Sequence, residues 1–429
     1  MQTNVASGSN LAITQQSVAL TAQITRAPGN LNALTGPAPK QSDAEANIKL
    51  QTSADMPFVR VTDLSTDPKG DKVTVDAFNV VSGKPIMGDR NAEGQGQKLS
   101  SSSFECKIDL STFNVDAGGK MSRQRTRHDL RRIARAELTR YFPQLVWQRC
   151  LVHLAGTRGS QNGVSWSIPL DTDADFTEIM INSVKAPTYN RHFVIDSTDF
   201  VQGGLQLASI DTADKWKLSH LDALAYKLEA IETKIPAPRI VGDEQAYDSP
   251  LKGILMMPPG SYNDLITDLT SGNNLRAYQA AVEQRQKWAP TSSVFKGECG
   301  IWRGILVKKM EHTIQLASGA AHQYVAVADK LTGNETAGTV ASLSGFHVER
   351  SLLLGAQALA RCEGASNSGV QAAIIENSYN AGRNFEYLGE FMGGECKFRF
   401  KFTNTAGDAE ATDNGVMVID AVSANVTGA

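Results

Sequence analysis

The densest group of residues with chemical potential is a set of arginines near the end of the first third of a 429-residue chain. Guanidinium groups contact phosphates and carboxylates, often through paired hydrogen bonds. Because the set is compact, a single helix would place most of it along one side. We expect either a solvated helix face or a contact surface for a polyanion. The candidates are Arg125, Arg131, Arg132 and Arg135.

Three aspartates imitate the start of a metal site. Asp171, Asp173 and Asp175 follow the first ligand positions of a calcium-binding loop. Phe176, however, stands where that loop needs glycine, and Asn182 stands where it needs the closing glutamate. The five cysteines have no CxxC spacing and no Cys/His pattern that would indicate zinc. We therefore expect no metal site.

The sequence contains no recognisable catalytic or cofactor-binding motif. Its seven histidines occur singly, without an HExxH or HxH arrangement. A GxSxG nucleophile turn, a GxxxxGK(S/T) phosphate loop and a GxGxxG fingerprint are also missing. The neighbouring carboxylates Asp243 and Glu244 lie in a segment rich in Pro and Gly, without a spacing that indicates acid–base work. We expect neither an enzyme nor a cofactor.

The arginines lie in the longest segment with a helical pattern, which runs from Met121 to Gly156. A helical period places an apolar stripe on one face and the arginines on the opposite face. Ser122 or Thr126 would cap the start, and Gly156 would end the helix. Pro143 removes a backbone donor, so we expect a kink there or two abutting helices. The apolar stripe comprises Leu130, Ile133, Ala134, Leu138, Tyr141 and Leu145.

The overall composition is that of an ordinary folded protein. The net charge is only −3, so affinity for a polyanion must come from a local patch. An odd and sparse set of cysteines suits free thiols in a reducing cytoplasm. The first residues do not resemble a secretory signal, and no apolar run is long enough to span a membrane. We expect a protein made in the cytoplasm that does not contact membranes.

Two segments in the first third of the chain lack the means to form a core of their own. Residues 1–50 are rich in small and polar side chains, which indicates a disordered tail or an arm that becomes ordered against a neighbour. Residues 72–80 and 104–115 alternate with a period of two and predict strands. The polar stretch between them makes a long hairpin whose tip needs something to rest on.

The rest of the chain alternates between helical and strand patterns. In the last strands, Phe398, Phe400 and Phe402 point to one face. We expect strands at 165–170, 176–184, 253–257, 295–310, 322–330, 396–404 and 415–422. We expect helices at 213–233, 274–288 and 348–364, and a helix that starts within 261–266 after a Pro-Gly turn at 258–260.

Several stretches together resemble the major capsid proteins of tailed phages related to the coat protein of coliphage N-four. The resemblance keeps the family's order over residues 58–422, except for a middle region near 200–290. Its hairpin-tip pattern consists of Gly83, Pro85, Gly88, Asp89, Glu93 and Gly94. The stretches are KGDKVTV, VSGKPIMGDRNAEGQ, MSRQRTRHDLRRIARAEL, LAGTRG, APTYNRH, IPAP, FKGECGIWRGILV, VERSLLLGAQALA, NSYNAGRN and GVMVIDA.

The resemblance implies an α+β fold of the Hong Kong 97 type. That fold has an N-terminal arm, an extended β-hairpin loop, a peripheral domain with a long spine helix on a β-sheet, and an axial domain. Carried onto this chain, it implies an arm at 1–57, the hairpin loop at 58–120, the peripheral domain with the spine helix at 121–195, the axial domain at 196–370 and a return to the peripheral domain at 371–429.

The resemblance also implies a function. Copies of the chain would assemble into pentamers and hexamers of an icosahedral shell around double-stranded DNA, with the spine-helix arginines facing DNA or a scaffold and the hairpin tip contacting a neighbouring copy. A portal protein, a scaffold and a cement or decoration protein would be partners in the virion. An alternative for the arginines is pairing with acidic residues of adjacent subunits. Alternatives for the protein are an encapsulin-like compartment and a monomeric β-rich enzyme or adhesin.

Overall fold

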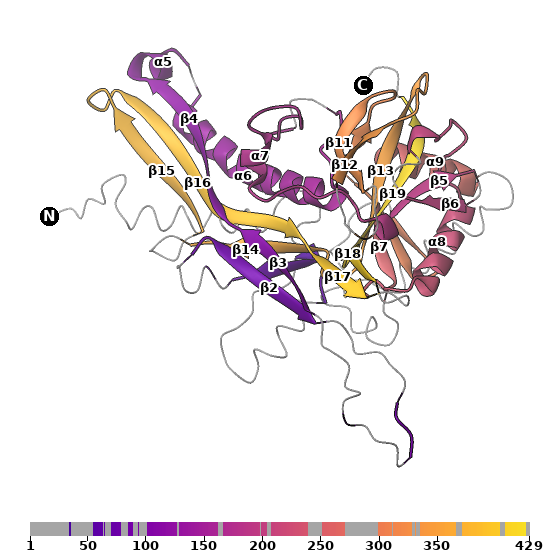
Figure 1. The fold of residues 1–429 in the computed structure, drawn as a ribbon. Coiled ribbons are helices and arrows are strands. Elements are labelled where there is room, and N and C mark those ends of the chain that lie inside the picture. Colours follow the sequence, from indigo (N-terminus) through magenta and orange to yellow (C-terminus); the bar gives the residue numbers. More distant parts are fainter. Residues whose placement is uncertain are drawn as a thin grey trace.

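The structure is a computed structural model. Its strands form two large sheets, and one long helix joins them (Figure 1). The expected α+β class is confirmed. Most of the expected arm and the expected helix at 274–288 lie outside the described residues. The structure describes residues 34–35, 55–62, 64, 70–78, 85–88, 93, 101–126, 128–161, 166–197, 199–203, 207–238, 251–270, 299–310, 312–327, 331, 335–365, 371–403 and 408–425.

The first sheet is built around a long strand that pairs along both edges. This strand, β16, pairs with β14 and β15 on one side and with β4 on the other. Sequence-distant strands therefore meet in one layer, and β1 extends the layer by parallel pairing with β14. The strands are β1 Phe58–Val61, β4 Asp109–Gly119, β14 Leu359–Glu363, β15 Ala372–Tyr379 and β16 Asn384–Lys397.

The expected hairpin is present at its base. Strand β2 (Lys72–Phe78) pairs with β3 (Ser101–Lys107) in antiparallel register, and β4 follows β3 directly along the chain. From Lys72 to Asp76 the side chains of β2 alternate between exposed and half-buried, which fits a ribbon that stands partly away from the body. The predicted strands at 72–80 and 104–115 are thus confirmed, the second as parts of two consecutive strands.

The second sheet contains strands from the middle and from the end of the chain. Its order is β6-β5-β19-β13-β7-β9-β8, with β10 paired to β13, and helices α8 and α9 pack against one face (Figure 1). Because β19 lies in this sheet, residues 371–429 contribute strands to both sheets. The elements are β5 His192–Asp196, β6 Asp199–Gln202, β7 Gly253–Met257, β8 Cys299–Trp302, β9 Ile305–Lys309, β10 Gln315–Leu316, β13 Phe346–Leu354, β19 Val416–Ala424, α8 Leu218–Ala230 and α9 Pro259–Thr270.

The remaining elements are short. Two small antiparallel pairs, β11 with β12 and β17 with β18, flank the larger sheets. Phe398 and Phe400 are buried in a cluster with Phe104, and Phe402 is half-buried beside them, which confirms the expected common face. These elements are α7 Phe176–Met180, a 3-10 turn at Tyr189–Arg191, β11 Ala321–Val327, β12 Glu335–Thr339, β17 Arg399–Thr403 and β18 Ala409–Asp413.

The long helix differs from the expectation in where it breaks. Helix α5 (Lys120–Arg125) is separate, and α6 (Leu130–Ala155) continues through Pro143 as one helix rather than as two abutting ones. The cap is Asp129, whose carboxylate accepts hydrogen bonds from the first backbone amides of α6, and not Ser122 or Thr126. The predicted end is confirmed, because Gly156 adopts φ +72 in the left-handed region.

A glycine allows α6 to lie directly on the first sheet. A Cβ atom at Gly389 of β16 would be 2.5 Å from the Phe142 ring and 3.2 Å from Leu138. These two side chains are fully buried, together with Tyr387 and Phe391 from the same strand. The apolar stripe is confirmed at its centre, whereas Ile133 at the start of α6 is 45% exposed.

Three secondary-structure predictions were wrong. Residues 348–364 were expected to form a helix but contribute to β13 and β14, because a continuous apolar run fits a strand that is buried on both faces as well as a buried helix. Residues 176–184 were expected to form a strand but begin with the helix α7, and 166–170 form no regular element.

Candidate functional site

Two of the four candidate arginines form ion pairs within the chain. Arg131 and Arg135 both bond to the carboxylate of Glu376, which comes from β15 and is only 4% exposed. Arg131 also donates a hydrogen bond of 3.0 Å to the hydroxyl of Tyr387. Burial by itself raises the pKa of Glu376, but the hydrogen bonds from Arg135 and Tyr387 and the arginine charges outweigh it and lower this pKa. These two arginines therefore fasten the start of α6 to the first sheet.

The other two candidates point to solvent. Arg125 at the end of α5 and Arg132 of α6 are exposed, and neither side chain forms an ion pair with a described residue. Arg140, about two turns further along α6, is also exposed and was not among the candidates. Three exposed arginines therefore remain on α5 and α6 beside the two that pair with Glu376.

The hairpin-tip candidates are described only in part. Gly83, Asp89 and Gly94 lie outside the described residues. In the described piece, Pro85 and Gly88 flank Ile86 and Met87, whose side chains are 38% and 69% exposed. Gly88 has φ +70, a conformation that favours glycine. The tip therefore presents two apolar side chains to solvent on a glycine turn. Glu93 also lies in the described residues.

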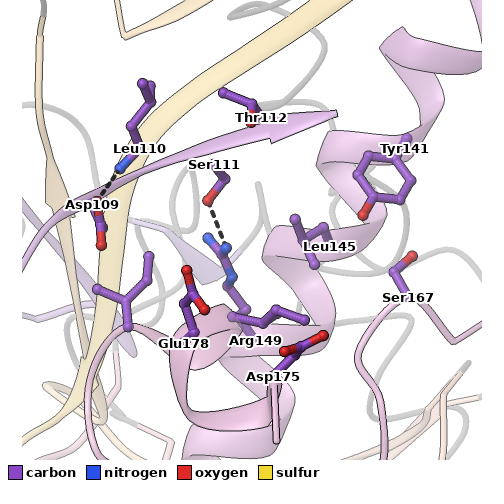
Figure 2. Close-up of a pocket in the computed structure, with 12 residues that line it drawn as sticks. Asp109, Leu110, Ser111, Thr112, Tyr141, Leu145, Arg149, Ser167, Asp175 and Glu178 are labelled. Atoms are coloured by element: carbon purple, nitrogen blue, oxygen red, sulfur yellow. Dashed lines mark hydrogen bonds between the residues drawn. The ribbon is translucent and has the colours of Figure 1, made fainter. Parts of the chain in front are cut away.

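A cavity of about 440 Å³ lies where β4, α6 and α7 meet (Figure 2). At its floor the guanidinium of Arg149 points toward β4 and donates a hydrogen bond of 2.6 Å to the hydroxyl of Ser111. Apolar walls and acidic groups surround this contact. The lining residues are Asp109, Leu110, Ser111, Thr112, Tyr141, Leu145, Arg149, Ser167, Asp175, Glu178, Ile179 and Ile181.

The charges of this cavity are unbalanced. Arg149 is 2% exposed, and its Nε and Nη1 atoms have no hydrogen-bond partner among the described residues. Its nearest acid, Glu395, is 4.0 Å away, and burial raises the pKa of that carboxyl. Asp109, Asp175 and Glu178 are exposed at the rim and form no ion pair with a described residue. The rim can therefore accept a cationic side chain from outside.

A buried charge network ties α6 to the second sheet. Arg350 of β13 bonds to both carboxylate oxygens of Asp420 in β19 at 2.8 Å, and His192 of β5 lies 2.6 Å from the same carboxylate. All three side chains are fully buried. Burial raises the pKa of Asp420, but Arg350 and His192 outweigh it and lower the pKa well below its usual range. No sequence motif indicates this network, because its members are far apart in the chain.

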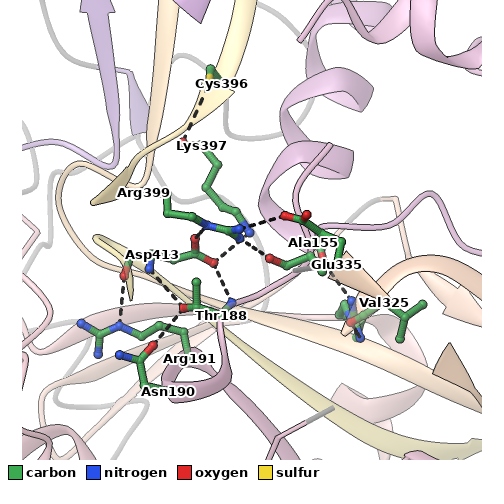
Figure 3. A network of polar contacts seen from close by, with 12 residues as sticks. Ala155, Thr188, Asn190, Arg191, Val325, Glu335, Cys396, Lys397, Arg399 and Asp413 are labelled. Atoms are coloured by element: carbon green, nitrogen blue, oxygen red, sulfur yellow. Dashed lines mark hydrogen bonds and ion pairs between the residues drawn. The ribbon is translucent and has the colours of Figure 1, made fainter. Parts of the chain in front are cut away.

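A second buried network lies where β16, β17 and β18 meet (Figure 3). The carboxylate of Asp413 pairs with Lys397 at 2.9 Å and with Arg399 at 2.8 Å, and it also accepts from the backbone amide of Thr188. Burial lowers the pKa of Lys397 to about 8, although Asp413 opposes this shift. The contacts join three strands to the turn before β5, which is a structural role.

No group of three or more described His, Cys, Asp or Glu side chains is placed to hold a metal ion. None of the helices in the described ranges is both long enough and apolar enough to cross a bilayer.

Comparison with known proteins identifies the family. The sequence model of a family described as phage capsid protein matches residues 4–425. The chain belongs to the phage capsid protein family. No curated protein sequence matches it. Among solved structures, it is similar to the capsid of Ralstonia phage GP4, with 22% identity, a TM-score of 0.64, and coverage of 88% of this chain and 90% of that one.

Two further phage capsid structures share the fold. The Cyanophage Pam1 capsid matches with 17% identity and a TM-score of 0.56 over 91% of this chain and 97% of that one. The capsid of Helicobacter pylori bacteriophage KHP30 matches with 13% identity and a TM-score of 0.52 over 92% and 97%. This family member is therefore a major capsid protein of the phage virion with a Hong Kong 97-type fold, and the family match does not favour an encapsulin-like compartment.

Proposed function

We propose that this capsid protein assembles with copies of itself into pentamers and hexamers of an icosahedral shell that encloses packaged double-stranded DNA. The observation that carries the proposal is the hairpin, whose tip exposes Ile86 and Met87 to solvent while the body of the subunit has complete cores. Exposed apolar side chains on a ribbon without its own core gain burial only by lying on another molecule. A shell lattice supplies that molecule.

The cavity between β4, α6 and α7 is the docking surface that we propose for the hairpin tip of a neighbouring copy. Its walls offer Leu145, Ile179 and other apolar groups, and its rim offers unpaired carboxylates. The tip sequence KPIMGDR combines the exposed apolar pair with Lys84 and Arg90. The apolar walls of the cavity match the apolar pair of the tip, and the acidic rim matches the basic residues of the tip. Electrostatic complementarity of this kind favours correct register between subunits.

Charge reversal tests this contact. Replacing Asp175 and Glu178 with lysine should block assembly, because Lys84 and Arg90 of the neighbour would then meet like charges. Replacing Lys84 and Arg90 with glutamate in the same chain should restore particles that either double variant alone fails to form. The matched control replaces Glu386 and Glu390 of β16 with lysine, a reversal on the first sheet outside the cavity lining. Normal assembly of the cavity variant would contradict the proposed docking.

We propose that the exposed arginines Arg125 and Arg132 face the packaged DNA or an acidic scaffold. Arg131 and Arg135 add their charge to the same face while they hold Glu376. Such contacts reach phosphates without sequence preference and weaken as salt rises. We also propose that the shell assembles in the host cytoplasm, with a portal protein, a scaffold and a cement or decoration protein as partners. The division into arm, hairpin, peripheral and axial domains also stays a prediction.

Assembly itself is tested by sedimentation of the purified chain across a range of concentrations, in the presence and absence of a co-expressed scaffold. We expect fast-sedimenting shells or capsomers. A single species near the chain mass of 46.2 kDa under every condition would overturn the proposal. Nuclease-protected DNA inside particles from infected cells distinguishes a genome container from a compartment that holds a protein cargo.

A further inference from the structure

Three buried cysteines from three strands meet where the base of the hairpin crosses the first sheet. Cys106 lies in β3, Cys362 in β14 and Cys396 in β16, and all three belong to one hydrophobic cluster with Phe104 and Phe398. They are 0%, 2% and 4% exposed. Cys106 and Cys396 each contact the strand that carries the other, and Cys362 lies in the same cluster. These cysteines take no part in the proposed docking contact or DNA contact.

The backbones of β3 and β16 cross closely at Cys106 and Cys396. The Cys396 thiol donates to the carbonyl of Glu105 at 3.5 Å, and the Cys106 thiol donates to the carbonyl of Gly394 at 3.9 Å. Gly394 permits this crossing, because a Cβ atom there would lie 2.0 Å from the carbonyl oxygen of Lys107. Each cysteine therefore contacts the strand that carries the other, one or two residues from its partner.

An asparagine reinforces the same crossing. The side-chain amide of Asn182 donates to the carbonyls of Lys107 and Glu395, both at 2.9 Å, and its oxygen accepts from the amide of Lys107 at 2.9 Å. The preceding residue, Ile181, has φ +64, an unfavourable conformation for a branched side chain. The Asn182 side chain thus holds the two strands together beside the thiols, so the cysteines do not separate freely.

The environment makes one thiol the better nucleophile. The hydrogen bond from Cys106 and the positive charges of Lys185, Lys397 and Arg399 lower the pKa of Cys396, although burial opposes this. Figure 3 shows Cys396 next to Lys397, with Arg399 beyond it. Hydrogen bonding with Cys362 and Cys396, together with burial, raises the pKa of Cys106. Because the thiolate is the reactive form, an oxidant should react first at Cys396.

We propose that the thiols of Cys396 and Cys106 form an oxidation site that closes to an intramolecular disulfide and fastens the hairpin base covalently to the first sheet. The oxidant is a hydroperoxide such as hydrogen peroxide. The Cys396 thiolate takes one oxygen atom and becomes a sulfenic acid, and hydroxide leaves. The Cys106 sulfur then attacks the Cys396 sulfur, the S–O bond breaks, and water is released as the S–S bond forms. Overall, two thiols and one hydrogen peroxide give one disulfide and two waters.

The site fits the change of surroundings that a virion protein experiences. Thiols stay reduced in a cytoplasm that contains glutathione and thioredoxin, and become oxidisable in an aerobic medium after release. Cys150 provides an internal comparison. It is also fully buried, but it lies on α6, outside the cluster that holds the other three, and burial raises its pKa. The same oxidant should therefore leave Cys150 reduced.

The experiment uses assembled particles of the full chain, purified with a reductant that is then removed. Particles are treated with hydrogen peroxide, denatured with an alkylating agent present, and mapped by mass spectrometry. We expect alkylatable thiols to fall from five to three per chain, with one linked peptide pair joining Cys106 to Cys396. Cys150→Ser should give the same linked pair. Cys106→Ser should abolish it and leave Cys396 as a sulfenic acid that dimedone traps.

Several results would overturn the proposal. Five alkylatable thiols after treatment would show that the site is not oxidised. A disulfide that omits Cys396, or one that joins two copies of the chain, would show that the assignment is wrong. If Cys106→Ser does not yield particles, the disulfide-linked peptides found in the unaltered chain still test the proposal. The readout is a covalent bond within one chain, so it stands or falls separately from the proposed docking of the hairpin tip.

Discussion

Nη1 of Arg350 donates a hydrogen bond of 2.8 Å to the carbonyl oxygen of Ala155, the last residue of α6. The last carbonyls of a helix lack partners within the helix, and a positive charge there also interacts favourably with the helix dipole. The same guanidinium pairs with Asp420 in the second sheet. One buried side chain therefore joins the long helix of the first sheet to the centre of the second.

Replacing Arg350 with methionine should destabilise the subunit by about 3–5 kcal/mol, because it leaves the Asp420 carboxylate buried without its main partner. Chemical denaturation of the unassembled subunit, followed by tryptophan fluorescence, measures the change. The matched control is Arg132→Met, which removes an exposed arginine of α6 and should alter stability by less than about 0.5 kcal/mol. Equal losses in the free energy of unfolding for the two substitutions would show that the buried network does not stabilise the subunit.

Gly389→Ala should weaken the contact between α6 and the first sheet. The added methyl group would meet the Phe142 ring at 2.5 Å, and overpacking of this kind typically costs about 1–3 kcal/mol. Combining it with Phe142→Leu removes the clashing ring edge, so the double variant should be more stable than the sum of the single effects implies. Strictly additive losses, measured by thermal unfolding of the subunit, would argue against this packing.

Stability should fall as the pH drops from about 6.5 toward 3. Burial lowers the pKa of His153 to about 3, with help from Arg149, Lys185 and Lys397 and against the carbonyl of Met180. The imidazole of an unfolded chain has a pKa of about 6.5. Between pH 6.5 and pH 3 the unfolded chain therefore binds a proton at His153 that the folded chain does not, so unfolding becomes easier as the pH falls. His153→Gln should flatten the dependence of the melting temperature on pH in this window, whatever its effect at pH 7. An unchanged slope would contradict the assignment.

The arginines of the helix face should divide into two classes. Replacing Arg125 and Arg132 with glutamine should leave subunit stability unchanged and reduce both retained DNA and its salt sensitivity. Glu376→Gln instead removes the shared partner of Arg131 and Arg135, so it should lower stability without reducing the positive charge. DNA content per particle and melting temperature, measured on both variants, separate the classes. Equal DNA retention in the Arg125 and Arg132 variant and in unaltered particles would contradict the proposed DNA contact.

Local sequence patterns correctly predicted the elements that depend on neighbouring residues alone. Alternation identified the hairpin strands, and the Gly156 stop and the helix within 213–233 followed from spacing and turn residues. The failure at 348–364 has a physical reason. Both faces of β13 are covered, so its side chains show no alternation and the segment reads as a helix.

The sites depended on pairings that no local pattern contains. Arg131 and Glu376 are 245 residues apart, and Arg350 and Ala155 are 195 apart. The available signal was a charged residue inside an otherwise apolar strand, as in Asp420 within GVMVIDA, which indicates a buried partner without naming it. The arginine spacing alone therefore could not distinguish the internally paired residues from those left at the surface.

Electron cryomicroscopy of purified particles tests the central claim most directly, because it shows where the hairpin of each copy lies. We expect closed shells in which residues 83–94 of one copy rest on the cavity between β4, α6 and α7 of the next. Particles in which each hairpin folds back on its own subunit, or preparations that contain only single subunits, would contradict it.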